Sequence, residues 1–274
     1  MADTPAPAPP ALALTIASSD SGGGAGIQAD LKAFARCGVH GMSAIVALTA
    51  QNTTGVTAIH ECPPAFVTAQ IEAVLSDLPP AAIKTGMLFS EPIIAAVAAA
   101  LADICGNPGG TPLVVDPVML ASSGSKLLKD NAIGALVELI FPLATVITPN
   151  LMEAQALTGL NTEDRAEIAE ALVAMGARGA LVTGGHGREA IDHLFDGKRH
   201  VELPVVRHVV AATHGAGCTH SAALAAGLAR GDRLEVAARR AAAVAGDAVL
   251  HGLVGIGAGD GPVDALNVRS MFPR

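Results

Sequence analysis

The chain has 274 residues but no tryptophan, no tyrosine and only six phenylalanines. It also lacks an excess of basic residues, because 17 lysines and arginines are outnumbered by 25 aspartates and glutamates, for a net charge of −8. Proteins that bind nucleic acids place cationic side chains against phosphates and aromatic rings against bases. The composition therefore predicts that the chain has no nucleic-acid partner.

The chain also lacks a Cys-x-x-Cys pair, and its four cysteines lie far apart, at Cys37, Cys62, Cys105 and Cys218. In a chain of this length, that spacing indicates reduced thiols and a cytoplasmic protein rather than a disulfide framework. No apolar run is long enough to span a bilayer, and no basic amphipathic stripe indicates binding to a membrane surface. Residues 1–10 are rich in alanine and proline without a basic residue, so we expect a disordered tail and not a signal peptide.

Half of the residues are hydrophobic, and alanine supplies much of that fraction, which favours close packing of helices on a sheet. Strand-like and helix-like patterns alternate along the chain, and no repeat or linker divides it. The predicted strands are 12–17, 42–48, 82–85, 113–115, 145–148 and 180–183, followed by a hairpin across Asp196-Gly197. We therefore expect one α/β domain over residues 11–274, with a mostly parallel sheet covered on both faces by helices.

A segment of small residues from Thr213 to Thr219, with the sequence THGAGCT, precedes a helix made largely of alanine, leucine and glycine. The backbone N–H groups at a helix start have no partners within the helix, and with the helix dipole they favour an anion, most often a phosphate. Cys218 falls in the first turn, where the pKa of a thiol tends to fall, so it is a candidate base for an attacking hydroxyl. The alternative is a tight loop with a buried structural cysteine, and the segment alone does not decide between the two.

A second glycine-rich segment, from Ser18 to Gly26, follows the first predicted strand. It is not a dinucleotide fingerprint, because Ile27 stands where that motif needs glycine or alanine. Open α/β sheets bind ligands past the C-terminal ends of their strands, so the segment indicates that a ligand approaches the backbone closely. On the next helix Asp30 lies on the apolar face, where an unpaired charge is costly. It either faces a ligand or is an acid favoured by the helix dipole.

Polar side chains follow three other predicted strands. Gln51 comes after strand 42–48 and offers both a donor and an acceptor, although a solvated loop amide is the commoner role for a lone glutamine. Asp116 follows a short apolar strand, a position typical of a magnesium-associated carboxylate or of a cap. Asn150 and Glu153 have the spacing of a helix capping box, and the same two groups suit a site for a metal and phosphates.

Taken in chain order, these segments form one pattern. The chain contains SDSGGGAGIQADLKAFARCGVHGMSAIVALTAQNT, KTGML, VVDPVMLASSG, ITPNLMEA, GGHG, THGAGCTHSAALAAGLA and GIGAGDGPV. This pattern resembles the hydroxymethylpyrimidine/phosphomethylpyrimidine kinases of thiamine biosynthesis, which belong to the ribokinase-like superfamily. The resemblance implies a three-layer α/β/α sandwich. It also implies ATP-dependent phosphorylation of 4-amino-5-hydroxymethyl-2-methylpyrimidine and of its monophosphate, with Mg²⁺ as the metal.

The resemblance also implies roles for individual residues. Residues expected at the aminopyrimidine are Asp30, Gln51, Ser18, Ala25 and Met87. The expected catalytic group is an anion hole with Cys218 as the base, formed by Gly215, Ala216, Gly217 and Cys218. The expected metal-associated carboxylates are Asp116 and Glu153. Residues expected beside the nucleotide are Asn150, Glu153, Thr183, Gly184, Gly185 and Thr213, together with the loop 255–259.

Three positions depart from the family pattern. Many relatives have lysine where this chain has Thr183, which puts the neutralisation of the phosphates in question. Ser18 replaces a common glycine, and Ala212 stands where a polar residue is frequent. Two other functions compete: a pyridoxal or pyridoxine kinase on the same fold, and a catalytically silent protein that senses the pyrimidine. Relatives often dimerise, so the resemblance also predicts a homodimer.

Overall fold

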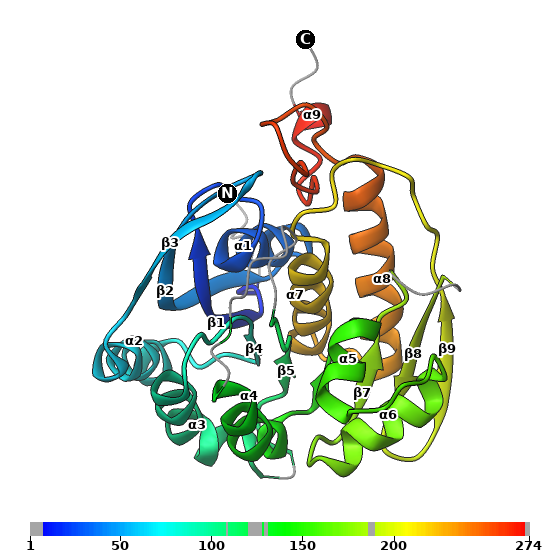
Figure 1. Cartoon of the computed structure of the whole chain (residues 1–274). Coiled ribbons are helices and arrows are strands. Elements are labelled where there is room, and N and C mark those ends of the chain that lie inside the picture. The colour runs from blue at the N-terminus through cyan, green and yellow to red at the C-terminus, as the bar shows by residue number, and fades with distance from the viewer. Residues whose placement is uncertain (1–7, 108, 120–127, 129–130, 186–189, 272–274) are drawn as a thin grey trace, which may run out of the picture.

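A computed structural model describes residues 8–107, 109–119, 128, 131–185 and 190–271. Within this part of the chain, nine strands form one sheet in the order β3-β2-β1-β4-β5-β6-β7-β8-β9 (Figure 1). Neighbouring strands from β2 to β7 run parallel, and β3, β8 and β9 join antiparallel at the two edges. The expectation of a mostly parallel sheet is confirmed.

The strands are β1 (Leu12–Asp20), β2 (His40–Asn52), β3 (Gly55–Glu61), β4 (Ala82–Thr85), β5 (Leu113–Val115), β6 (Val146–Ile147), β7 (Ala180–Val182), β8 (Ile191–Phe195) and β9 (His200–Pro204). The helices are α1 (Gly26–Arg36), α2 (Pro64–Asp77), α3 (Glu91–Cys105), α4 (Ala132–Ala135), α5 (Leu151–Thr158), α6 (Arg165–Ala174), α7 (Ala216–Ala229), α8 (Leu234–Leu250) and α9 (Val268–Met271). After α4 the chain continues as a π-helix (Leu136–Ile140) and a 3-10 helix (Phe141–Leu143).

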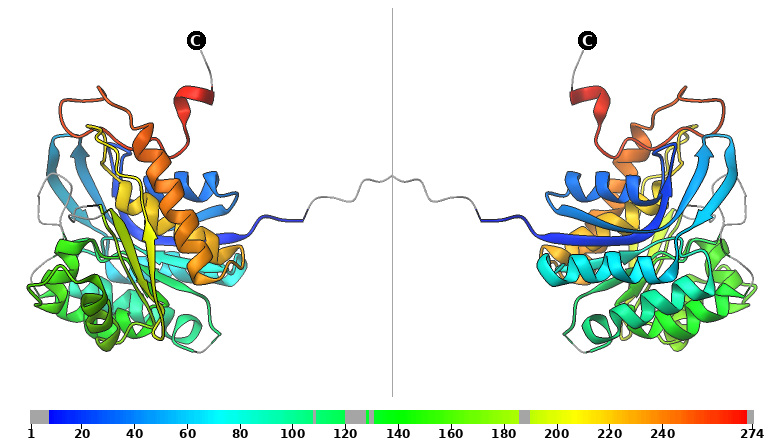
Figure 2. Two further views of the ribbon diagram at one scale, coloured as in Figure 1. Left: turned by 90° about the vertical axis from the view of Figure 1, so that its right-hand side faces the viewer. Right: turned by 90° about the vertical axis from the view of Figure 1, so that its left-hand side faces the viewer.

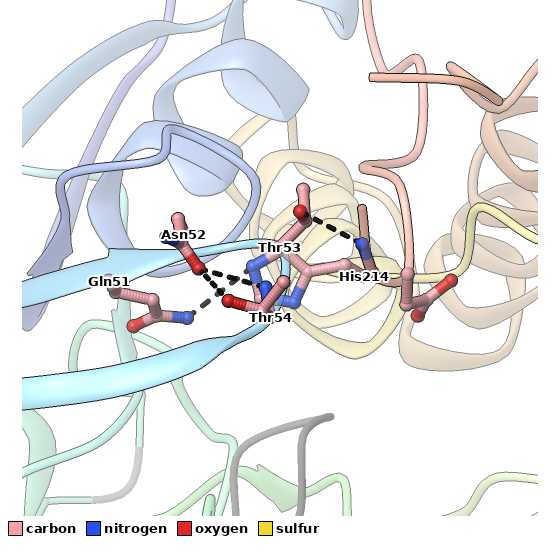
Figure 3. A pocket seen from close by; sticks show the side chains of 7 residues that line it. Gln51, Asn52, Thr53, Thr54 and His214 are labelled. Atoms are coloured by element: carbon pink, nitrogen blue, oxygen red, sulfur yellow. Dashed lines mark hydrogen bonds between the residues drawn. The ribbon is translucent and has the colours of Figure 1, made fainter. Parts of the chain in front are cut away.

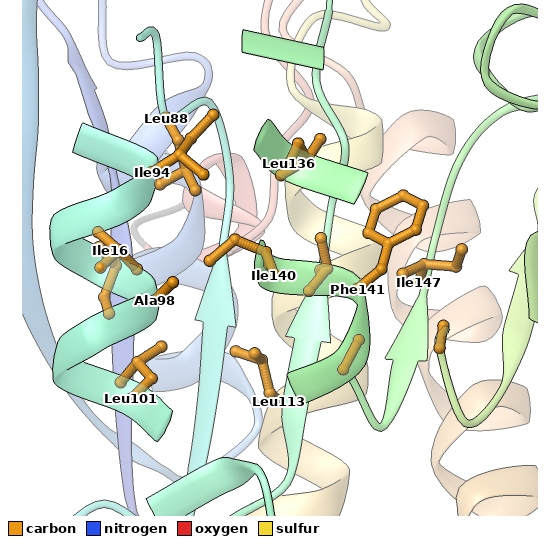
Figure 4. Packing of buried hydrophobic residues seen from close by; sticks show 14 of the residues in the cluster. Ile16, Leu88, Ile94, Ala98, Leu101, Leu113, Leu136, Ile140, Phe141 and Ile147 are labelled. Carbon is orange, nitrogen blue, oxygen red and sulfur yellow. The ribbon is translucent and has the colours of Figure 1, made fainter. Parts of the chain in front are cut away.

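The strands send alternate side chains to two separate cores, as the two-residue period of a strand requires. In β5, Leu113 and Val115 join one cluster while Val114 joins the other. Helices α2 to α6 complete the first cluster, part of which Figure 4 shows, and α1, α7 and α8 complete the second. Two cores on opposite faces of one sheet make the three-layer α/β/α sandwich that the sequence predicted.

The second core is thin, because its small alanine side chains let α7 lie close to its neighbours. Five consecutive residues of α7, Ala222 to Ala226, are buried there, and α8 contributes Ala237, Ala238 and Ala241. Gly227 of α7 packs so closely on α8 that an added Cβ would lie 2.8 Å from the Cβ of Ala237. Close packing of α7 fixes its first turn relative to the sheet.

One strand was missed by the sequence analysis. Residues 55–61 form β3, which pairs antiparallel with β2, and β2 itself extends to Asn52. Most β3 side chains are exposed or half-buried, so β3 has little of the apolar alternation that marks a strand in sequence. Residues 1–7 of the expected tail lie outside the described residues.

The C-terminal segment returns to the N-terminal part of the sheet. Arg36 of α1 donates a hydrogen bond to the carbonyl of Ala265, and the Gly259 N–H donates to the hydroxyl of Thr53 at the β2–β3 turn. In both views of Figure 2, α9 and the β2–β3 turn lie at the same end of the molecule. Of the described helices, none combines the length and apolar character needed to cross a bilayer.

Candidate active site

A cavity of about 770 Å³ opens at the C-terminal ends of the parallel strands. Residues at or just after the ends of five parallel strands line its wall: Asp20 at the end of β1, Gly86 after β4, Asp116 after β5, Asn150 after β6 and Thr183 after β7. This edge of an open α/β sheet is where ligands bind, as the sequence predicted. We call this space the main cavity.

The two glycine-rich loops interlock at one end of the main cavity. Gly215, before α7, has φ +84°, and a Cβ there would lie 1.8 Å from the carbonyl oxygen of Gly24. A Cβ on Gly24 would lie 2.3 Å from the ring of His214. Only glycine fits either position, so the loop after β1 and the loop before α7 are held in direct contact.

Asp20 joins the same two loops through its carboxylate. It accepts hydrogen bonds from the N–H groups of Gly22 (2.8 Å), Gly24 (3.1 Å) and Ala25 (2.9 Å). The ring nitrogen Nε2 of His214 lies 3.0 Å from its Oδ2. Burial favours the neutral acid, but the hydrogen bonds from His214, Ala25 and Gly22 outweigh it and hold the pKa of Asp20 below its ordinary value. The carboxylate is therefore charged at neutral pH.

The first turn of α7 forms the predicted anion cradle on the cavity wall. Gly215, Ala216, Gly217 and Cys218 all line the main cavity. The N–H of Ala216 donates to the carbonyl of Thr213 at 3.0 Å, and the N–H groups of Gly217 and Cys218 follow it at the start of the helix. All four residues expected in the cradle line the cavity, and anion binding by this turn stays a prediction.

The predicted lowering of the Cys218 pKa is wrong. Burial of the sulfur raises the pKa of the Cys218 thiol to about 12, although the Lys84 ammonium lowers it in part. The carboxylates of Asp116 and Asp30 add to the rise, because a thiolate near them would meet like charge. Desolvation and these two acids outweigh the Lys84 ammonium in setting the pKa of Cys218, and the thiol is neutral at pH 7.

Asp116 and Glu153 line the main cavity together. Glu153 closes the capping box of α5, accepting from the Asn150 N–H at 3.0 Å while its own N–H donates to Asn150 Oδ1 at 2.9 Å. Burial and the neighbouring charge of Asp116 raise the pKa of Glu153 to about 7. The capping box is therefore confirmed, and Asn150 and Glu153 also line the main cavity.

A divalent cation fits between these acids, because it would relieve the repulsion that raises the pKa of Glu153. Carboxylate oxygens are the ligands that Mg²⁺ prefers, and Mg²⁺ is usually held by one or two of them plus substrate phosphates. In the part of the chain that the structure describes, no three His, Cys, Asp or Glu side chains form a metal cluster of their own. The residues present therefore fit Mg²⁺ bound together with a nucleotide.

Asp30 is not on the wall of the main cavity, contrary to the sequence expectation. Its side chain is fully buried, and the ammonium of Lys84 lies 2.8 Å and 2.9 Å from its two oxygens. The hydroxyl of Thr15 donates to the same carboxylate at 2.6 Å. The carboxylate on the apolar helix face thus has a protein cation as its partner, and these bonds leave it no direct contact with a ligand.

Lys84 was not singled out by the sequence analysis, although it lines the main cavity. Its Nζ lies 3.9 Å from Asp116 Oδ2, and the hydroxyl of Ser221 donates to that same oxygen at 2.8 Å. Burial would lower the pKa of Lys84, but the carboxylates around it, Asp30 foremost, raise it above its ordinary value. The Lys84 ammonium therefore stays protonated at neutral pH, with its charge balanced by these carboxylates.

The other residues expected at the pyrimidine are brought together. Ser18, Ala25, Gln51 and Met87 all line the main cavity. The amide of Gln51 is held by the Thr49 hydroxyl at 3.0 Å, and its Nε2 lies 3.4 Å from His214 Nε2. Gln51 and His214 also border a smaller cavity of about 300 Å³, seen in Figure 3 beside the β2–β3 turn.

The residues expected beside the nucleotide lie together. Asn150, Thr183, Gly184, Gly185 and Thr213 line the main cavity. The lining side chains that the sequence analysis did not single out include Asp192, His220 and Arg207. The loop 255–259 does not line the main cavity: its Gly259 N–H donates to the hydroxyl of Thr53, and Gly259 lines the smaller cavity. A place for this loop beside the nucleotide stays a prediction.

Comparison with known proteins agrees with this geometry. A family model described as phosphomethylpyrimidine kinase matches residues 20–264. The chain is 50% identical over 251 residues to the hydroxymethylpyrimidine/phosphomethylpyrimidine kinase of Rhizobium meliloti, covering 87% of this chain and 91% of that protein. It is 45% identical over 246 residues to the corresponding kinase of Bacillus subtilis, covering 88% and 89%.

Two solved structures are similar over most of their length. The ADP complex of Bacillus subtilis pyridoxal kinase superposes with a TM-score of 0.85 at 35% identity, covering 95% of this chain and 99% of that one. Phosphomethylpyrimidine kinase from Clostridium difficile gives a TM-score of 0.75 at 39% identity, covering 85% and 96%. The fold is therefore ribokinase-like, and the sequence matches show that the chain belongs to the phosphomethylpyrimidine kinase family.

Proposed function

We propose that this protein transfers the γ-phosphoryl group of ATP to 4-amino-5-hydroxymethyl-2-methylpyrimidine and then to the resulting monophosphate. The product of the two steps is the pyrimidine diphosphate used to assemble thiamine. One observation carries the proposal: Gln51, the N–H cradle at Gly217 and Cys218, and the Asp116–Glu153 pair all face one cavity. Family membership supports the same activity.

The residues of the chain supply positioning and charge. Gln51, with its amide held by Thr49, is placed to hydrogen-bond a ring nitrogen or the amino group of the pyrimidine. The N–H groups of Gly217 and Cys218 point toward the space where charge on the transferring phosphoryl group is spread. In-line transfer between two held substrates needs little covalent chemistry from the protein.

Mg²⁺ is proposed as the metal, held by Asp116 and Glu153. When bound, it neutralises charge on the phosphate oxygens. Asn150, Thr183, Gly184, Gly185 and Thr213 are proposed to border the nucleotide. We further propose that the protein works in the cytoplasm as a homodimer, since its cysteines are far apart and relatives often dimerise.

Cys218 is proposed to receive the proton of the substrate hydroxyl. With a pKa raised to about 12, its thiol is protonated at pH 7 in the empty site, so only a small fraction of molecules carries the thiolate. Cys218→Ala should keep the binding of both substrates and lower kcat by about 10²–10⁴, the usual worth of one acid–base group. An unchanged kcat for this variant, measured at saturating substrates, would remove Cys218 from the role.

Because Asp30 is enclosed by Lys84 and Thr15, a second activity competes with the proposed one. The sequence analysis used Asp30 together with Gln51 to favour an aminopyrimidine over pyridoxal, and the structure leaves only Gln51 for that choice. Pyridoxal kinase from Bacillus subtilis also superposes closely on this chain. A pyridoxal kinase activity is therefore the second candidate.

One experiment separates these functions. Purified protein is incubated with Mg·ATP and either hydroxymethylpyrimidine or pyridoxal, and the mono- and diphosphate products are measured by mass spectrometry. We expect a higher kcat/KM for hydroxymethylpyrimidine, with the diphosphate appearing after the monophosphate. A higher kcat/KM for pyridoxal would overturn the proposal in favour of the second candidate. Absence of ATP consumption with both alcohols would indicate a silent binding protein.

A further inference from the structure

One buried hydroxyl group joins two parts of the cavity wall. Ser221 lies on α7, one helical turn after Gly217, and its side chain has no exposed surface. Its Oγ lies 2.8 Å from Asp116 Oδ2, 3.0 Å from the carbonyl oxygen of Gly217 and 3.1 Å from that of Cys218. Ser221 is not among the described residues that line the main cavity. It therefore lies behind the wall, between the carboxylate of Asp116 and the first turn of α7.

The Ser221 hydroxyl has one hydrogen to donate, and three acceptors surround it. A serine within a helix often bonds only a carbonyl three or four residues before it, which here would be Cys218 or Gly217. Asp116 Oδ2 is the nearest acceptor, and a carboxylate accepts a stronger hydrogen bond than a neutral carbonyl. The hydroxyl therefore donates to Asp116, and its contacts with the two helix carbonyls are secondary.

The two oxygens of Asp116 have different surroundings. Oδ2 is held from inside the protein, by the Ser221 hydroxyl and by the Lys84 ammonium at 3.9 Å. Among the residues that the structure describes, none donates a hydrogen bond to Oδ1. Asp116 is buried but keeps a small exposed fraction and lines the main cavity. With Oδ2 held from behind, Oδ1 is the oxygen left for a ligand in the cavity.

The orientation of Asp116 matters for the proposed Mg²⁺ site. Mg²⁺ demands near-ideal octahedral geometry with oxygens at about 2.0–2.1 Å, so a carboxylate that rotates freely is a poorer ligand. Residues that hold metal ligands from behind typically change metal affinity by about 10–100-fold when they are replaced. Because Ser221 belongs to α7, its hydrogen bond also fixes Asp116 relative to the N–H groups of the proposed anion cradle.

We propose that Ser221 is a positioning residue for phosphoryl transfer: its hydroxyl holds Asp116 Oδ2, directs the other oxygen to the cavity and aligns the carboxylate with the first turn of α7. The inference rests on the proposed kinase function and on Mg²⁺ at Asp116. Ser221 itself touches neither substrate in this role. It acts through Asp116 by keeping the metal and the anion cradle in register.

The test compares Ser221→Ala with Thr219→Val in the full-length protein. Thr219 lies on the same helix and is fully buried, and its hydroxyl has no hydrogen-bond partner among the described residues. Thr219→Val keeps the shape of the side chain, so it controls for the loss of a buried hydroxyl that holds nothing. Ser221→Cys, which keeps a side chain of similar size with a weaker donor, is measured as a second variant in case Ser221→Ala folds poorly.

Calorimetric titration with AMP-PCP, a non-hydrolysable ATP analogue, gives a readout that does not depend on turnover. It is carried out with Mg²⁺ and with EDTA, and in the wild type we expect Mg²⁺ to tighten binding. In Ser221→Ala this Mg²⁺-dependent gain should fall about tenfold, while the Kd in EDTA stays within twofold of the wild type. Ser221→Cys should lie between the two, and Thr219→Val should match the wild type in both conditions.

Steady-state kinetics give a matching expectation. The Mg²⁺ concentration at half-maximal rate should rise about tenfold in Ser221→Ala, with the KM for the pyrimidine within twofold of the wild type. The inference is overturned if the Mg²⁺-dependent gain in binding stays within twofold of the wild type. An equal loss of AMP-PCP binding with and without Mg²⁺ also overturns it, because that result indicates a general structural defect.

Failure of the kinase proposal gives a different result. In that case no phosphorylated product forms with either alcohol, but the effect of Mg²⁺ on AMP-PCP binding still tests Ser221. A wild type whose AMP-PCP binding does not respond to Mg²⁺ overturns the role of Ser221, whatever the activity. A gain that is lost in Ser221→Ala and kept in Thr219→Val supports it.

Discussion

The two permanent cations on the described wall of the main cavity are held in opposite ways. Lys84 is fully buried with Asp30 and has its charge balanced by the protein before any ligand arrives. Arg207 is exposed and anchored through the carbonyl of Gly184. A buried cation fixes the groups around it, whereas an exposed guanidinium places its charge at the cavity surface. The wall near Lys84 is thus built on a fully buried ion pair, and the wall near Arg207 includes an exposed charged side chain.

The two Asp–His pairs whose histidines flank Cys218 in the sequence are both buried, but they differ in their hydrogen bonds. Asp20 accepts from three loop N–H groups and from His214, and this loop interlocks with the α7 loop through Gly24 and Gly215. Asp192 accepts from one N–H and from His220. The more heavily bonded pair belongs to the interlocked loops, where we propose that the phosphoryl group is transferred and where geometric precision matters most. The comparison predicts that substitutions in the interlocked loops cost more stability than substitutions at Asp192.

The largest effect is expected from breaking the Lys84–Asp30 pair. Lys84→Met leaves a buried carboxylate without its cation, and we expect a loss of about 3–5 kcal/mol in unfolding free energy. Replacing both partners, as in Lys84→Met with Asp30→Asn, removes the stranded charge and keeps an acceptor for Thr15. The double variant should therefore recover more than half of the loss, measured by urea unfolding.

The matched control for this prediction is a surface ion pair. Arg239 and Glu235 lie at 2.9 Å on the exposed side of α8, and Arg239→Met should change stability by about 0–1 kcal/mol. A Lys84→Met protein as stable as the Arg239→Met control would show that Lys84 is not held by buried pairing. The contrast drawn between the two cations would then be wrong.

A second prediction concerns the interlocked loops. Gly215→Ala forces a side chain into the left-handed region and against the Gly24 carbonyl, so we expect a loss of about 2–4 kcal/mol and a large fall in kcat. Gly217→Ala is the control for stability, because an added Cβ there meets nothing within 4 Å. Its unfolding free energy should stay within about 0.5 kcal/mol of the wild type. If thermal melts showed equal losses of stability for Gly215→Ala and Gly217→Ala, the close contact between the two glycine-rich loops would not be what makes Gly215 necessary.

Much of this architecture was predictable because it depends on local pattern. The short strands predicted at 82–85 and 113–115 became β4 and β5 with the predicted bounds. Asn150 and Glu153 form the capping box that their spacing indicated. Asp116 was recognised as a cavity residue because parallel strands end at one edge of a sheet, and any polar residue there is brought to that edge.

The errors at the site come from contacts between distant segments. Asp30 lies on the apolar face of its helix, as predicted, but its partner Lys84 is 54 residues away and belongs to a four-residue strand. Nothing local to Lys84 indicates burial, since lysine is rarely fully buried. The pKa of Cys218 was misjudged for the same reason: the helix start is local, while burial and Asp116 are tertiary. Sequence patterns thus assigned residues to helices and strands, but they did not show which distant side chains contact each other.

The smallest effect is expected at the nucleotide end, in the pH dependence of stability. Burial raises the pKa of Asp192, but the hydrogen bonds from His220 and from the Gly184 N–H outweigh it and hold that pKa below its ordinary value. An acid with a lowered folded pKa stabilises the fold above its unfolded pKa of about 4, and the contribution disappears as the pH falls through the folded value. Asp192→Asn should therefore be destabilised by about 1–3 kcal/mol at pH 7, and by less below pH 4.

Urea unfolding of wild type and Asp192→Asn at pH 7, 5 and 3.5 measures this difference directly. The Asp20 carboxylate titrates in both proteins, so its contribution cancels in the comparison and the remaining pH dependence belongs to Asp192 and its partner His220. Glu72→Gln, at an exposed position of α2, is the charge-matched control and should differ little from the wild type at any of these pH values. A difference that stays constant or grows on acidification would mean that Asp192 is not stabilised as an anion. The Gly184 loop, and with it the anchor of Arg207, would then need another support.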